Sequence, residues 1–271
     1  MLGAVAVENV SFTYERGTVP ALSGISVSVA SGETLGIVGP TGSGKSTLLN
    51  LLGRLFEADS GHVLLDDHSV TDLPLDTLRG VLGYVPQDSF LFSEAYDENI
   101  RFGADHEVSD EDIDTLIERV AMTAEVAEFA DGKKALVGER GVTLSGGQRQ
   151  RTCIARALAR DPKVLVLDDC LSAIDTETER ELLGSLRAAG EGRTVLVAAH
   201  RLTTVANADR ILVLTAQGGV ETVGTHAELV ARPGWYAETW EQQQRTESLA
   251  QSIEREVQAA PKESARAGGS Q

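Results

Sequence analysis

A glycine-rich segment near residue 40 has the residue types and order of a phosphate-binding loop. It reads Gly39-Pro40-Thr41-Gly42-Ser43-Gly44-Lys45-Ser46-Thr47. Its glycines let the backbone bend so that successive N–H groups converge on phosphate oxygens, and a helix that follows adds the positive end of its dipole. The lysine would neutralise β- and γ-phosphate charge, and the serine hydroxyl would bind Mg²⁺. The segment therefore predicts a site for a nucleoside triphosphate with magnesium.

A carboxylate farther along the chain can complete this site. Asp168 directly follows residues 164–167, a continuous apolar run typical of a buried strand. In P-loop enzymes, an aspartate at the end of such a strand shares the magnesium ion with the hydroxyl of the loop. A glycine turn alone could simply cap an ordinary helix, but the pairing with Asp168 argues against that alternative. We therefore expect Ser46 and Asp168 to belong to one site.

The elements that must position these groups follow from the apolar pattern. Continuous apolar runs at residues 35–38, 81–85, 164–167 and 195–199 indicate parallel strands covered on both faces. Apolar residues that alternate at positions 5, 7 and 10 and at 25, 27 and 29 predict an N-terminal antiparallel β-layer. A hairpin is expected from residues 211–214 and 220–223. The glycine loop is followed by apolar residues at helical spacing, namely Leu48, Leu49, Leu51, Leu52 and Leu55. The fold class is therefore α/β.

Two regions depart from the strand pattern. Between about residues 88 and 160 the strand signals vanish, and apolar residues recur at i, i+3, i+4 and i+7 in Ile113, Leu116, Ile117 and Val120. We interpret this region as an inserted helical subdomain. From residue 241 onward polar residues dominate, so we expect one domain over residues 1–240 and a polar, partly disordered tail over 241–271.

Composition narrows the function classes. The 271 residues carry a formal net charge of -17, with acids crowded between positions 94 and 139, and such a field opposes nucleic-acid binding. Cys153 and Cys170 lack metal-ligand spacing and are expected to be reduced thiols. The sequence has no run of about 18 to 20 apolar residues and no basic start at residues 1–8, so we expect neither a membrane span nor a signal peptide.

The segment Leu144-Ser145-Gly146-Gly147-Gln148 resembles the signature motif of ATP-binding cassette (ABC) proteins. Physically, Ser145 can cap a helix that runs through Arg149 and Ala157, which leaves the N–H groups of Gly146 and Gly147 free to meet a phosphate. In the family, each ATP lies between the P-loop of one domain and the signature loop of a second domain. The resemblance therefore implies an obligate pair of ATP-binding domains.

Other positions match the family in order over roughly residues 5–239. Tyr14 resembles the aromatic residue that stacks on adenine, although a tyrosine after Phe12 could equally be core. Gln87 resembles the glutamine that senses magnesium and water, and His200 the histidine that senses the γ-phosphate. Ser172-Ala173-Ile174-Asp175 resembles the loop that joins the two sites.

The resemblance implies a P-loop NTPase with a RecA-like core and a complete set of site residues for ATP and Mg²⁺. The expected catalytic residues are Asp169, His200 and Gln87, and the magnesium ligands are Ser46, Gln87 and Asp168. Nucleotide contacts are expected from Tyr14, Gly39, Thr41, Gly42, Ser43, Gly44, Lys45, Ser46, Thr47, Ser145, Gly146, Gly147 and Gln148.

Two segments resemble ABC exporters rather than importers. Val137-Gly138-Glu139-Arg140-Gly141 is similar to a segment in which the acid touches membrane-domain loops, and residues 90–103 are similar to a groove for a coupling helix. Phe90 and Phe92 could instead belong to the subdomain core. The exporter resemblance implies transmembrane domains as partners and a place at the cytoplasmic face of the cell membrane. A soluble ABC ATPase that acts on nucleic acid is the alternative, and the acidic charge opposes it.

One residue departs from the family pattern. After the magnesium aspartate the family usually has a glutamate that polarises the attacking water, whereas this chain has Asp169. A carboxylate withdrawn by roughly 1.5 Å predicts a site that binds ATP but hydrolyses it slowly. We therefore expect a non-identical partner that retains the glutamate; an aspartate acting as a weak base in a homodimer, and an ATP-sensing subunit with little hydrolysis, are the alternatives. Cys170 could suggest a redox switch, but a small buried residue is the commoner role.

Overall fold

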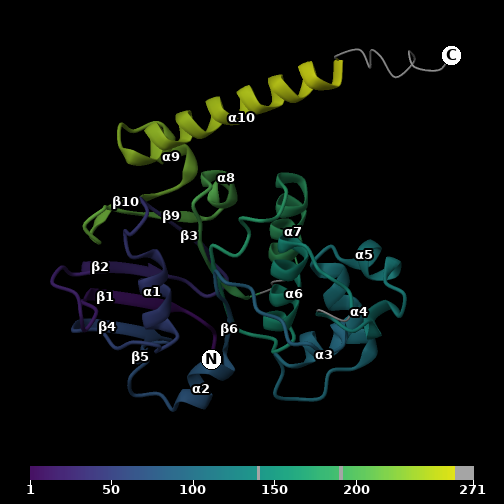
Figure 1. Ribbon diagram of the computed structural model, residues 1–271. Coiled ribbons are helices and arrows are strands. Elements are labelled where there is room, and N and C mark those ends of the chain that lie inside the picture. Colours follow the sequence, from purple (N-terminus) through teal and green to yellow (C-terminus); the bar gives the residue numbers. More distant parts are fainter. Residues whose placement is uncertain (139–140, 189–191, 260–271) are drawn as a thin grey trace.

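The chain folds around two β-sheets. The computed structural model describes residues 1–138, 141–188 and 192–259, so Glu139 and Arg140 of the exporter-like segment lie outside the described residues. One sheet has four strands in the order β2-β1-β4-β5, and the other has six in the order β10-β9-β3-β8-β7-β6 (Figure 1).

The six-stranded sheet forms the centre of the molecule. Strands β3 (Thr34–Val38), β6 (Leu82–Val85), β7 (Val164–Asp168) and β8 (Thr194–Ala198) are parallel, and every residue of β3, β7 and β8 is buried. The hairpin of β9 (Arg210–Leu214) and β10 (Val220–Gly224) extends the sheet beyond β3. The continuous apolar runs and the hairpin pattern predicted these strands. Each observed strand end matches the predicted end or differs from it by one residue.

The N-terminal antiparallel layer is also confirmed. It consists of β1 (Val5–Phe12), β2 (Leu22–Val29), β4 (Ser60–Leu65) and the short β5 (His68–Ser69). In β1 and β2 the alternating apolar side chains are buried and face α1 and the central sheet in one core cluster.

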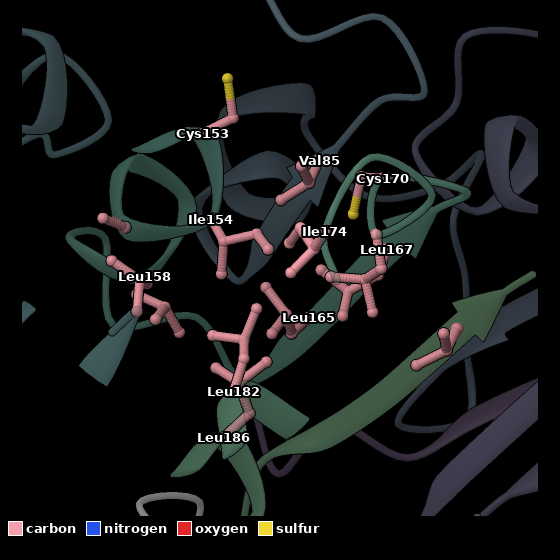
Figure 2. Packing of buried hydrophobic residues seen from close by; sticks show 14 of the residues in the cluster. Val85, Cys153, Ile154, Leu158, Leu165, Leu167, Cys170, Ile174, Leu182 and Leu186 are labelled. Carbon is pink, nitrogen blue, oxygen red and sulfur yellow. The ribbon is translucent and has the colours of Figure 1, made fainter. Parts of the chain in front are cut away.

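Helices cover both faces of the central sheet. Alternate strand residues belong to different core clusters: Leu35 and Ile37 lie in the cluster of α1 (Lys45–Leu52), whereas Val38 lies in the other cluster. That second cluster contains α6 (Gly146–Leu158) and α7 (Thr176–Ala188), whose side chains pack against β6 and β7 in Figure 2. Helices α1 and α6 therefore lie on opposite faces of the sheet.

The inserted helical subdomain contains α3 (Tyr96–Arg101), α4 (Asp110–Arg119), α5 (Thr123–Glu128), the 3-10 turn η1 (Gly132–Lys134) and α6. The predicted amphipathic helix is α4, which begins at a Ser109 capping box and buries Ile113, Leu116 and Ile117. The acidic residues of α4 are exposed and form a solvated face, whereas Asp97 in the same acid-rich segment is buried and paired with Lys134. Helix α2 (Leu75–Gly80) precedes β6.

The remaining described helices are α8 (Leu202–Val205), which precedes the β9–β10 hairpin, and α9 (His226–Val230) and α10 (Trp235–Ala259), which follow it. Helix α10 extends away from the rest of the molecule in Figure 1. Helix α10 runs through the domain boundary expected at residue 240, so residues 241–259 of the predicted polar tail are helical, and residues 260–271 lie outside the described part. None of the helices in the described ranges is long and apolar enough to cross a bilayer.

Candidate nucleotide-binding site

The P-loop, residues 39–47, joins β3 to the start of α1, where the sequence placed it. Gly42 and Gly44 have φ values of 81° and 92°, in the left-handed region that favours glycine. Gly44 is the N-cap of α1, and a Cβ atom there would lie 2.5 Å from the carbonyl oxygen of Ala21. Glycine is therefore required at position 44 both by the backbone and by the space available.

The ammonium group of Lys45 is held inside this loop. Its Nζ donates to the carbonyl oxygens of Gly39 at 3.0 Å and Pro40 at 3.2 Å. Burial lowers the pKa of Lys45, and the nearby Asp169 and Asp168 carboxylates partly oppose that shift. The Ser43 hydroxyl is also buried, and it has no hydrogen-bond partner in the described residues. The buried Lys45 ammonium group and the unpaired Ser43 hydroxyl could both bind an anion such as a polyphosphate, because each would gain a partner from it.

The expected pairing of Ser46 with Asp168 is confirmed. The Ser46 hydroxyl donates to Asp168 Oδ1 at 2.7 Å. The single hydroxyl hydrogen of Tyr84 has two acceptors within reach, Asp168 Oδ2 at 3.3 Å and Asn50 Oδ1 at 2.8 Å. Burial raises the pKa of Asp168, and the hydrogen bonds from Ser46 and Tyr84 work against this increase. Sequence reasoning missed Tyr84, although its place in β6, the strand beside β7, could have suggested it.

This oxygen-only pair fits Mg²⁺, which prefers carboxylate and hydroxyl ligands and retains several waters. The third expected ligand, Gln87, lies just after the end of β6 and is exposed. Across the described residues its side chain makes no hydrogen bond to Ser46 or Asp168. The structure therefore brings two of the three predicted magnesium ligands, Ser46 and Asp168, together. Gln87 follows the end of β6, the strand beside the one that carries Asp168.

Tyr14 lies beside the start of α1. Its hydroxyl and that of Thr47 are 2.9 Å apart, and its ring packs edge-on against Phe12 and Phe56 at centroid distances of 4.9 and 5.3 Å. Because Tyr14 is 41% exposed, it is not a core residue, and part of its ring remains open to a planar ligand. Thr47 stays a predicted nucleotide contact, and its hydroxyl lies beside that of Tyr14.

Asp169 and His200 lie next to each other after β7 and β8. Asp169 has a left-handed backbone, with φ of 46°. Its Oδ1 accepts a hydrogen bond from the His200 backbone N–H at 3.4 Å, and its Oδ2 lies 3.7 Å from His200 Nε2. The Asp169 side chain is 14% exposed and that of His200 is 46% exposed. The carboxylate is thus directed toward the His200 loop, residues 199–201.

The signature loop, residues 144–148, begins α6 as predicted. The Ser145 hydroxyl accepts from the Gln148 backbone N–H at 3.2 Å, and the Gln148 side chain accepts from the Ser145 N–H at 2.9 Å. A Cβ atom on Gly147 would lie 2.9 Å from the Ala173 carbonyl oxygen, so the loop packs closely on residues 172–175 of the same chain. Gln150 strengthens this contact by accepting from the Ala173 N–H at 3.0 Å.

The predicted residues therefore fall into two groups. Lys45, Ser46, Asp168, Asp169 and His200 lie together at the carboxyl ends of β3, β7 and β8. The signature residues lie at the start of α6, on the other face of the sheet from α1. This separation agrees with the expectation that one chain does not bring its signature loop to its own P-loop.

An aromatic surface formed by Phe90, Phe92 and Phe102 lies beside a pocket that is also lined by Tyr84. Phe90 and Phe102 are 65% and 66% exposed, so Phe90 is not part of the subdomain core. Phe92 packs between them, with ring centroids 5.1 and 4.4 Å away, and Arg156 lies over the rings of Phe92 and Phe102. A pocket of about 260 Å³ opens beside Phe90, Phe102 and Arg156. Exposed aromatic side chains around a pocket are typical of a docking surface.

Comparison with known protein families and sequences identifies close relatives. The family described as ABC transporter matches residues 22–172. An ATP-dependent lipid A-core flippase of Cupriavidus pinatubonensis is 44% identical over 237 residues, which cover 87% of this chain and 40% of the flippase. A probable multidrug resistance ABC transporter ATP-binding/permease protein of Bacillus subtilis is 42% identical over 242 residues, or 89% of this chain and 41% of that protein.

A solved structure shows the same fold. The structure of a bacterial Atm1-family ABC exporter with ATP bound superposes with a TM-score of 0.84 at 41% identity, covering 89% of this chain and 42% of the exporter. The chain thus spans about two fifths of the length of these relatives.

Proposed function

Because this chain belongs to the ABC transporter family, we propose that it is the ATP-binding and ATP-hydrolysing motor domain of an exporter, placed at the cytoplasmic face of the membrane. The observation that carries this proposal is the arrangement of Lys45, Ser46 and Asp168. A buried ammonium group lies in a glycine loop, and beside it a hydroxyl and a carboxylate lie 2.7 Å apart. This combination suits the charge of a nucleoside triphosphate and its magnesium ion.

Each group has a role that follows from its chemistry. The P-loop N–H groups and Lys45 bind phosphate oxygens, Tyr14 offers a ring face to the adenine, and His200 reaches the terminal phosphate. Ser46 and Asp168, with Gln87, hold Mg²⁺, which when bound neutralises phosphate charge. Ser145, Gly146, Gly147 and Gln148 serve the nucleotide of a second ATP-binding domain, because α6 begins on the other face of the sheet from α1.

The aromatic surface supports an exporter assignment. We propose that Phe90, Phe92 and Phe102 receive a helix from the transmembrane domains, so that closure of the two ATP-binding domains moves those helices. The relatives named above support this placement, since their printed descriptions are those of a flippase, an ATP-binding/permease protein and an exporter. Transport of a substrate across the membrane is the activity of the assembled protein, of which this chain supplies the motor.

Asp169 supports a slow site. A general base must approach to within about 3 Å of the proton it removes, and a carboxylate shortened by one methylene is withdrawn by roughly 1.5 Å. In addition, both oxygens of Asp169 face the His200 loop, at 3.4 and 3.7 Å. We therefore propose that this site binds ATP tightly, turns it over slowly, and pairs with a non-identical domain that carries a glutamate. The intact signature loop completes the partner's site.

The test is steady-state MgATP hydrolysis by the chain and its Asp169→Glu variant at several protein concentrations. We expect Asp169→Glu to raise turnover about tenfold or more, because a misplacement near 1 Å costs up to about 10²-fold. Lys45→Ala provides the blank, and a steep dependence on concentration would report pairing of domains. Substantial native turnover that Asp169→Glu leaves unchanged would favour a working homodimer instead.

A further inference from the structure

The His200 loop has contacts on two sides. Toward the P-loop side, the Ala199 N–H donates to the Ile37 carbonyl at 3.1 Å, and the His200 N–H donates to Asp169 Oδ1. Arg201 donates to the carbonyl oxygens of Ser172 and Ile174 at 3.2 and 3.3 Å. These bonds tie the loop to β3 and to residues 169–175, which belong to the site described above.

On its other side the loop is held by the C-terminal helix. Nε2 of Gln243 in α10 donates to the His200 carbonyl oxygen at 3.0 Å. Oε1 of the same side chain accepts from the Leu202 N–H at 2.9 Å. Leu202 is the first residue of α8, and its N-cap Arg201 makes no side-chain cap bond, so Gln243 supplies the cap from a distant element. One planar amide thus bonds both to the His200 carbonyl within the loop and to the Leu202 N–H just after it.

The start of α10 explains why Gln243 is held at this place. Tyr236, Trp240 and Gln243 occupy i, i+4 and i+7 positions and share one helix face. Tyr236 is 2% exposed, and its hydroxyl lies 2.8 Å from His226 Nδ1. The Trp240 ring lies 4.5 Å from the His226 ring, centroid to centroid. Aromatic packing on α9 therefore fixes the turn of α10 that presents Gln243.

We propose that Gln243 is a positioning residue for His200, so that ATP hydrolysis depends on the seating of α10 against the domain. This inference rests on the proposed ATPase function. Among the twenty side chains, glutamine combines a donor and an acceptor on one planar group with enough reach to span both backbone groups. Without it, the His200 carbonyl and the Leu202 N–H lose their partner, and His200 is free to leave the position facing Asp169.

Amide hydrogen exchange tests the contact independently of activity. In Gln243→Leu we expect the Leu202 amide to exchange about threefold to tenfold faster, the change that corresponds to loss of one hydrogen bond. Gln242→Leu is the matched control, because Gln242 is the exposed neighbour on the same helix. Equal exchange at Leu202 in the two variants would overturn the proposal.

Kinetics test the positioning role. In an Asp169→Glu background, Gln243→Leu should lower kcat about tenfold while the Kd for a fluorescent ATP analogue changes less than about twofold. In a His200→Ala background the same change should cause no further loss, because the two residues act as one unit. Unchanged kcat, or an equal loss with and without His200, would overturn the positioning role. An Asp169→Glu chain with native Gln243 and His200 but no turnover above the Lys45→Ala blank would instead overturn the proposed function.

Discussion

At the scale of single residues, the environment of Asp168 decides how firmly the site can hold a divalent cation. The carboxylate is buried, which raises its pKa and disfavours the charged form that a metal requires. Hydrogen bonds from Ser46 and Tyr84 favour that charged form. Because Ser46 is itself an expected magnesium ligand, Tyr84 is the group that can orient Asp168 without leaving its place when the cation binds.

Replacement of Tyr84 by Phe should therefore weaken MgATP binding by about tenfold, in the range expected for loss of a partner behind a metal ligand. The loss should grow as the pH falls, because Asp168 without the Tyr84 hydroxyl takes up its proton at a higher pH. Titration of a fluorescent ATP analogue with Mg²⁺ and with EDTA, at several pH values, measures this. If Tyr84→Phe weakened binding of the analogue as much in EDTA as with Mg²⁺, the explanation would be contradicted, because Asp168 has no metal to bind in EDTA.

At the scale of elements, the seating of α10 on α9 includes contacts with His226, whose surroundings favour its neutral form. Burial lowers the pKa of His226 below its ordinary value, and its Nδ1 lies 2.8 Å from the Tyr236 hydroxyl. In the unfolded chain the pKa returns to about 6.5. Below that value the unfolded state binds more protons than the folded state, so acid favours unfolding, and the stability that neutral His226 provides is lost as the pH falls through its folded pKa.

We accordingly expect the melting temperature to fall more steeply between about pH 7 and pH 5 in the native chain than in His226→Asn. Asparagine can accept the Tyr236 hydrogen bond from nearly the same place but does not titrate. Carboxylates with raised pKa values, such as Asp168 and Glu179, contribute equally in both proteins and cancel in the comparison. Parallel curves for the two proteins would show that His226 does not set the acid sensitivity.

The same scale shows what the sequence could and could not predict. The central strands were predictable because burial on both faces requires an unbroken apolar run, as in residues 164–167. Strand β4 escaped notice because its pattern starts with Ser60-Gly61-His62 and has few apolar residues. Helix α8 has only four residues and packs over Gly36, where a Cβ atom would lie 2.6 Å from Val205. Gln243 could not be predicted, because its role depends on contacts with residues about forty positions away.

At the scale of the whole molecule, the proposed function requires a single chain to contain two incomplete halves of a nucleotide site. The P-loop group lies at the carboxyl ends of the central strands, and the signature loop begins α6, on the opposite face of the sheet from α1. If two domains pair head to tail, each P-loop meets the signature loop of the other domain. Two chains with different defects should then be able to share one competent site.

This pairing predicts complementation between two inactive variants, both carrying Asp169→Glu so that turnover is measurable. Lys45→Ala disables the P-loop but keeps the signature loop, whereas Ser145→Glu places a negative charge where a phosphate would lie but keeps the P-loop. Each variant alone should be inactive. In an equal mixture half of the pairs contain both variants and have one intact site of two, so about a quarter of the parent activity per chain should return. Mixing Lys45→Ala with itself at the same total concentration is the control. A mixture as inactive as its components would contradict a site shared between two chains, because a site formed within one chain cannot be repaired by another.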